Sequence, residues 1–255
     1  METLKVIKIG GNVIDTPLAL EAFLKDFAAL PGAKILVHGG GAIASRTLKR
    51  MGIEPKMIDG RRVTDAETLQ VVTAVYAGLI NKIIVATLQK YGCNAIGLSG
   101  ADANAITSRK RPATPVDYGF VGDIEKVNKD TFEALLAAGM TPVVCAINHD
   151  GAGTLLNTNA DTIASGIACT LCGIRQVELV LCFEKDGVLA DKDDAGSVIP
   201  LIDKPLFEKL KADGTINAGM LPKLKNAFDA IDAGVSKVII KNSARLTDDS
   251  GTTIH

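Results

Sequence analysis

The chain has 255 residues and a formal net charge of −1, with 28 Lys and Arg residues against 29 Asp and Glu residues. This length suits one large domain or two small ones. Hydrophobic residues make up 47% and charged residues 22%, which is ordinary globular usage and excludes disordered and fibrous classes. A chain this close to neutral has no overall field that attracts nucleic acid, so any anion must be held by locally placed groups.

Taken in chain order, the hydrophobic patterns predict strands and helices in alternation. Strands are expected at residues 4–9, 34–37, 95–98, 141–146, 177–182 and 235–240. Helices are expected at 18–29, from the glycines near 41 to about 51, and at 66–90, 130–138, 160–172, 204–211 and 220–232, with Gly78 as a point where the helix at 66–90 could break. Residues 52–65 and 103–125 are expected to form hairpin-like excursions.

This alternation predicts an α/β fold, a three-layer αβα sandwich with a mostly parallel, open central sheet. We expect two lobes with a boundary near Gly173. This boundary is inferred from the arrangement of the elements alone, since no flexible linker marks it.

The cysteine count is five, an odd number, and most of the cysteines lie in apolar runs such as the one that ends at Cys145. We expect buried free thiols, as is usual in a reducing cytosol. Cys169 and Cys172 form a C-x-x-C pair inside an expected helix, and the histidines are widely separated, so no metal site is expected.

The first residues lack the apolar core of a signal peptide. We also expect no apolar stretch to reach the roughly 18 residues that span a bilayer. The sequence therefore predicts a cytoplasmic protein that binds small molecules and makes no contact with nucleic acid or membrane.

Small residues follow three of the expected strands, as Gly10-Gly11, Gly39-Gly40-Gly41 and Ser99-Gly100. In an open α/β sheet, ligands bind beyond the carboxyl ends of the strands. Glycines there expose backbone N–H groups, and a following helix adds the positive end of its dipole. One such loop could be only a tight turn, but two on successive strands favour an anion-binding site.

Two lysines are candidates for the same site. Lys8 lies in the apolar strand just before the first glycine loop, where its ammonium group could point into the anion site or, at a sheet edge, into water. Lys223 stands at the start of an expected helix and carries less information, because most helix lysines are solvated.

Arg61 and Arg62 stand together in a turn, and a guanidinium group suits a two-pronged grip on a carboxylate. A pair of ordinary surface arginines is the alternative. Asn157 to Asp161 precede a helix, where helix capping alone would account for Asn and Asp. Capping and ligand binding are compatible functions for this segment.

Together these motifs resemble the amino acid kinase family and, within it, the acetylglutamate kinases of arginine biosynthesis. The arginine turn combined with the N-x-N-A-D segment is the most specific part of the resemblance. The motifs run nearly end to end: Lys8-Ile9-Gly10-Gly11-Asn12, Val37-His38-Gly39-Gly40-Gly41, Gly60-Arg61-Arg62-Val63-Thr64, Gly97-Leu98-Ser99-Gly100-Ala101-Asp102, Gly119-Phe120-Val121-Gly122-Asp123-Ile124, Asn157-Thr158-Asn159-Ala160-Asp161 and Gly219-Met220-Leu221-Pro222-Lys223.

The resemblance implies transfer of the γ-phosphoryl group of ATP to the γ-carboxylate of N-acetyl-L-glutamate. Mg²⁺ would bridge the nucleotide phosphates, with no dedicated metal site on the protein. Residues 1–173 would form the acylglutamate-binding and dimerisation lobe, and residues 174–255 the nucleotide-binding lobe. A homodimer insensitive to arginine is expected, since the first strand starts at about residue 4 and leaves no room for the extra N-terminal helix of arginine-inhibited members.

The resemblance also implies roles for single residues. Lys8 and Lys223 would contact the transferring phosphoryl group from two sides, and Asp161 would hold the two lysines in position. Backbone N–H groups would bind the phosphate and, at the second loop, also the acceptor carboxylate. These N–H groups belong to Gly11, Gly40 and Gly41, and Gly10 would be a further phosphate-binding residue.

At the substrate end, Arg62 and Asn157 would hold the α-carboxylate of the amino acid. Gly100, Glu184 and Asp186 would lie toward the nucleotide. Here the sequence departs from the family, which usually has a Ser/Thr-Asp pair where this chain has Phe183-Glu184-Lys185-Asp186.

Alternatives therefore stay open. On the same fold, the chain could act on N-succinyl-L-glutamate, or be another amino acid kinase that acts on free glutamate or carbamate. In a different class, it could be a non-catalytic protein that binds a nucleotide or another small molecule.

Overall fold

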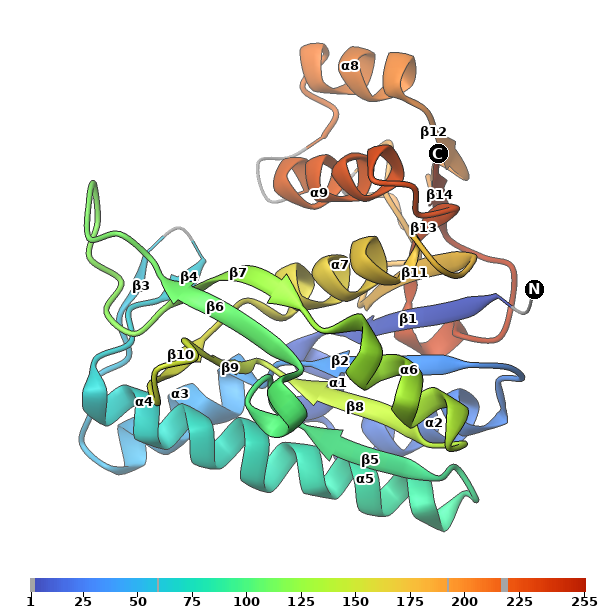
Figure 1. Cartoon of the computed structure of the whole chain (residues 1–255). Helices are drawn as coiled ribbons and strands as arrows, with labels where there is room; N and C mark the ends of the chain where they lie inside the picture. The colour runs from blue at the N-terminus through green and yellow to red at the C-terminus, as the bar shows by residue number, and fades with distance from the viewer. Residues whose placement is uncertain (1–2, 59, 192, 217–219) are drawn as a thin grey trace.

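The structure is a computed structural model that describes residues 3–58, 60–191, 193–216 and 220–255. Its centre is an eight-stranded sheet that extends through both halves of the chain (Figure 1). Neighbouring strands are parallel, except that β13 and β14 are antiparallel. The order across the sheet is β12 (Leu201–Ile202), β14 (Thr252–Ile254), β13 (Lys237–Asn242), β11 (Val177–Phe183), β1 (Leu4–Ile9), β2 (Lys34–His38), β8 (Thr141–Cys145) and β5 (Ala95–Leu98).

The predicted α/β class with a mostly parallel open sheet is confirmed. The strands that precede Gly173 form one half of the sheet, and those that follow it form the other. The halves meet where β1 pairs with β11 in parallel, from Leu4 opposite Val177 to Ile9 opposite Cys182. Hydrogen bonding is therefore continuous between the two halves. The short strands β12 and β14 were not predicted.

Helices cover both faces of this sheet. On one face α6 (Lys129–Ala137), α7 (Ala160–Leu171) and α9 (Leu221–Asp232) pack against the strands, and α8 (Lys204–Ala212) packs on α9. On the other face lie α1 (Gly11–Asp15), α2 (Pro17–Ala29), α5 (Asn81–Lys90) and the short η3 (Ser243–Arg245), with α3 (Gly41–Arg50) beside α1. Pro17 at the first position of α2 fits the predicted start of that helix.

A second, four-stranded sheet lies beyond the ends of the main strands (Figure 1). Both predicted hairpins are confirmed, as β6 with β7 and as the separate pair β3–β4. The strands β9 and β10 were missed because each has only three residues. The second sheet has the order β10 (Leu155–Asn157), β9 (Ile147–His149), β6 (Ile106–Lys110) and β7 (Gly122–Val127), and the separate pair is β3 (Met57–Ile58) with β4 (Arg61–Arg62).

One long helix extends over residues 66–90 as α4 (Ala66–Thr73), a π-helical segment η1 (Ala74–Ile80) and α5. Gly78 does not break it, because the chain widens into the π-helix instead. In the described part of the chain, this helix is long and apolar enough to cross a membrane, by length and composition only. The expectation that no apolar stretch reaches this length is therefore wrong. Its packing against β5 and β8 is that of a core helix.

Cys93, Cys145 and Cys182 are buried, and all five thiols are free, as predicted. Cys169 lies inside α7 and Cys172 at its C-cap. Burial raises the pKa of both thiols, so both stay protonated and unreactive at neutral pH.

His38 ends β2 with its side chain fully buried, at 0% exposure. Burial lowers the pKa of His38 from 6.5 to about 4, so the folded protein keeps the ring neutral in mildly acidic solution. The unfolded chain takes up a proton at this residue as the pH falls below 6.5, whereas the folded chain does not. The stabilising contribution is therefore complete above pH 6.5 and is lost progressively between pH 6.5 and pH 4.

We predict that this residue alone lowers the free energy of unfolding by about 2 kcal/mol between pH 7.5 and pH 5.0. Urea unfolding at the two pH values measures it in the wild type and in His38→Asn, which lacks the titrating ring. The same loss of stability in both proteins would contradict the assignment.

Candidate active site

A cavity of about 360 Å³ opens at the carboxyl ends of β1 and β2, beside the first turn of α7. This is the position at which open α/β sheets bind ligands. The β3–β4 pair and the end of β10 close it from the second side. The charged and polar side chains in its lining are Lys8, Asn12, Arg61, Arg62, Tyr76, Asn157, Thr158, Asn159 and Asp161.

Two lysines converge on one carboxylate at the edge of this cavity. The Lys8 ammonium nitrogen lies 2.9 Å from Oδ1 of Asp161, and that of Lys223 lies 4.0 Å from Oδ2. Burial raises the pKa of Asp161, but Lys8 and Lys223 outweigh it, and the pKa lies below its usual value. The three groups carry a net charge of +1, which attracts an anion to this point.

Lys8 reaches the site from β1 and is 12% exposed, whereas Lys223 reaches it from the first turn of α9 and is 37% exposed. The ammonium group of Lys223 also lies 5.7 Å from the centre of the Phe183 ring. Phe183 is the last residue of β11. Phe183 thus lies beside the more exposed of the two cations. Gly219, part of the same motif, lies outside the described residues.

The second glycine loop lies in the cavity wall, where Gly40 and Gly41 begin α3. Gly40 has a φ of +149°, and a Cβ atom there would lie 2.2 Å from Cδ1 of Ile80. Only glycine fits this position. Gly11, the first residue of α1, also lines the cavity.

Gly10 does not offer its amide to a ligand. Its N–H donates to the carbonyl of Cys182 at 3.1 Å. This bond continues the β1–β11 pairing one residue beyond the strand, so the Gly10 N–H is not free for a ligand. The phosphate-binding role of Gly10 stays a prediction.

Gly100 lies far from the cavity, after the edge strand β5, with β8, β2 and β1 between it and β11. Its N–H donates to the Ile147 carbonyl at 2.7 Å, and a Cβ atom would lie 2.4 Å from Oδ1 of Asn148. The glycine is required where β5 meets the second sheet. Gly100 is thus separated from Glu184 and Asp186 by three strands of the main sheet, and its nucleotide-binding role stays a prediction.

Glu184 and Asp186 follow β11, the strand next to β1. The side-chain amide of Asn242 donates to the Glu184 carbonyl at 3.1 Å and to Oδ1 of Asp186 at 2.7 Å. Arg245 lies 3.6 Å from the second oxygen of Asp186. Neither residue lines the cavity. Their nucleotide-binding role stays a prediction.

Arg62 is 6% exposed, on β4. Its Nη2 donates to the Gly41 carbonyl at 2.8 Å and to Oγ of Ser45 at 2.7 Å. Among the described residues, Nε and Nη1 have no hydrogen-bond partner. Arg62 lines the cavity, and a guanidinium group at this position is suited to a ligand carboxylate.

Asn157 ends β10 and also lines the cavity. Its side-chain amide donates to Oγ1 of Thr64 at 3.1 Å, and its backbone N–H donates to the Phe120 carbonyl at 2.9 Å. The structure therefore brings Arg62 and Asn157 to one cavity, as the sequence predicted.

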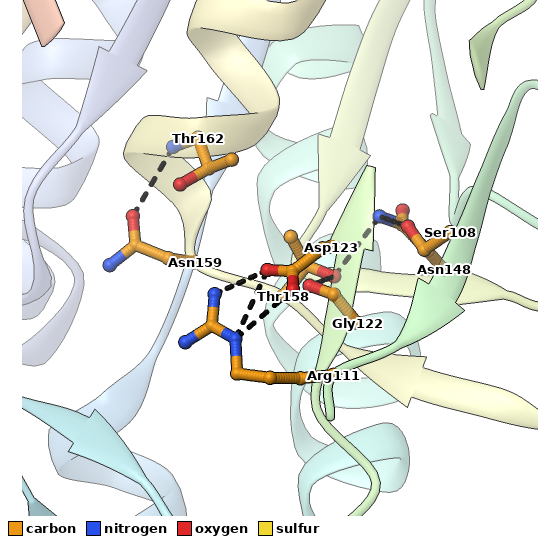
Figure 2. Close-up of polar contacts among 8 residues, drawn as sticks. All are labelled: Ser108, Arg111, Gly122, Asp123, Asn148, Thr158, Asn159 and Thr162. Atoms are coloured by element: carbon orange, nitrogen blue, oxygen red, sulfur yellow. Dashed lines mark hydrogen bonds and ion pairs between the residues drawn. The ribbon is translucent and has the colours of Figure 1, made fainter. Parts of the chain in front are cut away.

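The segment that carries these residues is held by a buried network (Figure 2). The side-chain amide of Asn148 donates to Oγ of Ser108 at 3.0 Å and to Oγ1 of Thr158 at 3.2 Å. The Thr158 hydroxyl donates to the Gly122 carbonyl at 3.1 Å. Sequence analysis missed Asn148, because it lies on a strand that was expected to be a loop.

The next residue, Asn159, caps α7. Its Oδ1 accepts from the backbone N–H groups of Asp161 at 2.8 Å and Thr162 at 3.3 Å (Figure 2). The predicted cap is confirmed, and it fixes the first turn of α7 from which Asp161 projects.

This architecture matches a known family. The sequence model of the amino acid kinase family matches residues 3–242. The chain belongs to this family. As a member of the amino acid kinase family, it is 58% identical over 249 residues to the acetylglutamate kinase of Cytophaga hutchinsonii, covering 97% of this chain and 94% of the relative.

Other comparisons agree. Identity to the acetylglutamate kinase of Phocaeicola vulgatus is 54% over 253 residues, covering 99% of this chain and 98% of the relative. Among solved structures, smu.665 from Streptococcus mutans superposes with a TM-score of 0.79 at 26% identity, over 98% of both chains.

Replacing Thr158 tests the buried network. We predict that Thr158→Val lowers the free energy of unfolding by about 1–3 kcal/mol, because valine keeps the shape but leaves the Gly122 carbonyl without its donor. Thr158→Ser, the matched control, keeps the hydroxyl and loses only a methyl group, at about 0.8 kcal/mol. Urea unfolding compares them, and a serine variant less stable than the valine variant would contradict the role of the hydroxyl.

Proposed function

We propose that this chain transfers the γ-phosphoryl group of ATP to the γ-carboxylate of N-acetyl-L-glutamate. The observation that carries the proposal is the convergence of Lys8 and Lys223 on Asp161, at the edge of a cavity that Arg62 also lines. The identity to curated acetylglutamate kinases over nearly the whole chain supports the substrate.

The chemistry needs no general base. A glutamate side chain has a reference pKa of about 4.3 and is ionised at neutral pH, so the acceptor is already a nucleophile. What the reaction requires is that two anions meet and that the charge of the transferring group is neutralised. The lysines supply this charge in our proposal, and Asp161 holds both of them at one point.

The acceptor is held at its other end. The guanidinium group of Arg62 would bind the α-carboxylate, together with the Asn157 side chain. The N–H groups of Gly11, Gly40 and Gly41 would bind oxygens of the phosphoryl group and of the attacking carboxylate. With the α-carboxylate fixed, the γ-carboxylate reaches toward Lys8 and the glycine loops.

ATP would lie over the end of β11, near Glu184 and Asp186. The described residues include no group of three or more His, Cys, Asp or Glu side chains that could hold a metal ion. In our proposal Mg²⁺ arrives on the nucleotide. When bound, the ion neutralises charge on the β- and γ-phosphates.

The proposal also covers assembly and location. Residues 1–173 would bind the acylglutamate and form the dimer contact, residues 174–255 would bind the nucleotide, and the protein would act as a cytoplasmic homodimer. Leu79 and Ile83 on the long helix are 53% and 47% exposed, and Leu18 on α2 is 81% exposed. These apolar side chains support a contact between copies in the first lobe.

We predict that Lys8→Ala and Lys223→Ala each lower turnover about 10²- to 10³-fold with the fold intact, since each removes one preorganised positive charge. Lys225→Ala, an exposed lysine on the same helix as Lys223, is the matched control and should retain full turnover. Coupled ADP release measures the rates, and circular dichroism checks the fold. Near-normal turnover in either site variant would remove that lysine from the mechanism.

A specific observation favours N-succinyl-L-glutamate as a second candidate. Asp123 is hydrogen-bonded by Arg111, which is the main cause that lowers the pKa of Asp123, and Arg61 and Arg109 lower it further. Three guanidinium groups thus act on one carboxylate, and Arg61 lines the cavity next to Arg62. The excess positive charge suits a second carboxylate at the far end of the acyl group.

A substrate panel decides between these acceptors. Free, N-acetyl- and N-succinyl-L-glutamate are supplied with ATP and Mg²⁺, and the acyl phosphate is trapped with hydroxylamine. We predict turnover of the acylated substrates and little of free glutamate, whose ammonium group would lie near Arg62. Arg61→Ala should lower turnover of the succinyl substrate at least 10-fold more than that of the acetyl substrate if Arg61 binds the second carboxylate.

The other outcomes decide the alternatives. An equal effect of Arg61→Ala on both substrates would remove Arg61 from acyl recognition. Turnover of free glutamate or carbamate alone would assign another amino acid kinase. An absence of ADP release with every acceptor would leave the non-catalytic binding protein.

A further inference from the structure

His38 and Asn81 form a buried hydrogen-bonded pair directly behind the second glycine loop. Neither side chain lines the cavity, and their exposures are 0% and 1%. Asn81 follows the π-helical segment, and His38 is the last residue of β2 before the glycines. The mechanism proposed above uses neither residue.

The hydrogen bonds determine the state of the histidine ring. The Asn81 amide nitrogen lies 2.9 Å from the Val143 carbonyl and 3.1 Å from Nε2 of His38, while the Asn81 amide oxygen accepts from Lys82 at 3.0 Å. The amide nitrogen therefore donates to Nε2, which must be unprotonated. On the other side of the ring, Nδ1 lies 2.8 Å from the Gly39 carbonyl and must carry the proton. Only the neutral Nδ1–H tautomer satisfies every partner.

The Gly39 carbonyl belongs to the same peptide group as the Gly40 N–H. Holding the carbonyl toward the ring turns the N–H to the opposite side, and a hydrogen bond to the carbonyl oxygen makes the N–H a stronger donor. Ile80 and Tyr76 of the π-helical segment pack against Gly40 and limit its movement. The loop that lines the cavity is thus held from behind by one ring and one helix.

We propose that His38, held by Asn81, is a positioning residue that orients the Gly39–Gly40 peptide so that the N–H group of Gly40 stabilises the transferring phosphoryl group. The inference rests on the proposed kinase function for the role of that N–H group. The ring itself does not reach the substrate, so it acts only through the peptide.

Two isosteric variants separate the two sides of the ring. His38→Asn places an amide nitrogen where Nδ1 lies and keeps the donor to Gly39. His38→Gln places its amide where Nε2 lies and keeps only the contact with Asn81. His149→Asn, a histidine on β9 outside the cavity lining, is the control for loss of a histidine.

We expect His38→Asn to stay within about 5-fold of wild-type kcat and His38→Gln to lose roughly 10- to 100-fold, with KM for both substrates changed little, because misplaced groups act on the transition state. His149→Asn should match the wild type. Equal losses in the two His38 variants would indicate packing alone and overturn the proposal. Wild-type kcat in His38→Gln, or a change confined to KM, would also overturn it.

A measurement on the unmodified protein keeps the proposal testable if a variant fails to fold. Nitrogen-15 NMR of the three histidines at pH 7 should show His38 as the neutral Nδ1–H tautomer. An Nε2–H tautomer would overturn the proposal whatever the protein phosphorylates. Failure of the whole substrate panel in the wild type would instead contradict the kinase function, so the two failures are distinguishable.

Discussion

The carboxylate of Asp161 is the group on which the rest of the site depends. Without an anion between them, the ammonium groups of Lys8 and Lys223 would repel each other at the mouth of a partly enclosed cavity. With Asp161 in place, both ammonium groups lie close together at one carboxylate. Lys8 comes from the first half of the main sheet and Lys223 from a helix of the second half, so this one carboxylate links the two halves at the cavity.

The second sheet acts on this carboxylate from a distance. Asp161 projects from the first turn of α7, and the Asn159 side chain caps that turn. Thr158, the residue before Asn159, is hydrogen-bonded to Gly122 and Asn148. The strands that bring Asn157 to the cavity therefore also set the start of α7. The second sheet is thus a rigid support for the side chains that would bind the two anionic substrates.

Several features of the cavity depart from local structural preference. Arg62 is buried with two donors unused, and Gly40 is held at a positive φ against Ile80. The helix widens into a π-helix where it meets the glycine loop. Such departures from local preference are common at the functional sites of proteins.

Sequence patterns predicted the long elements well and the short ones poorly. The strands around Lys8 and Cys182 and the helix that begins near Ala160 have clear periodicity and were found. The strands β9 and β10 have three residues each, and hydrophobic periodicity cannot identify so short a strand. Gly10 and Gly100 also follow strands, as expected of glycines that bind an anion. The Gly10 N–H instead bonds to the neighbouring strand, and Gly100 leaves space for the Asn148 side chain.

The sequence by itself determined the α/β class, the glycines that follow strands and the residue types suited to phosphate and carboxylate, because these follow from periodicity and side-chain chemistry. Only the tertiary structure decided which of those residues meet. Lys223 gave almost no local signal, and its convergence with Lys8 arises from the packing of α9 on α7. Which glycine amides remain free was likewise decided by long-range hydrogen bonds, since partners distant in the sequence compete with a ligand for every N–H group.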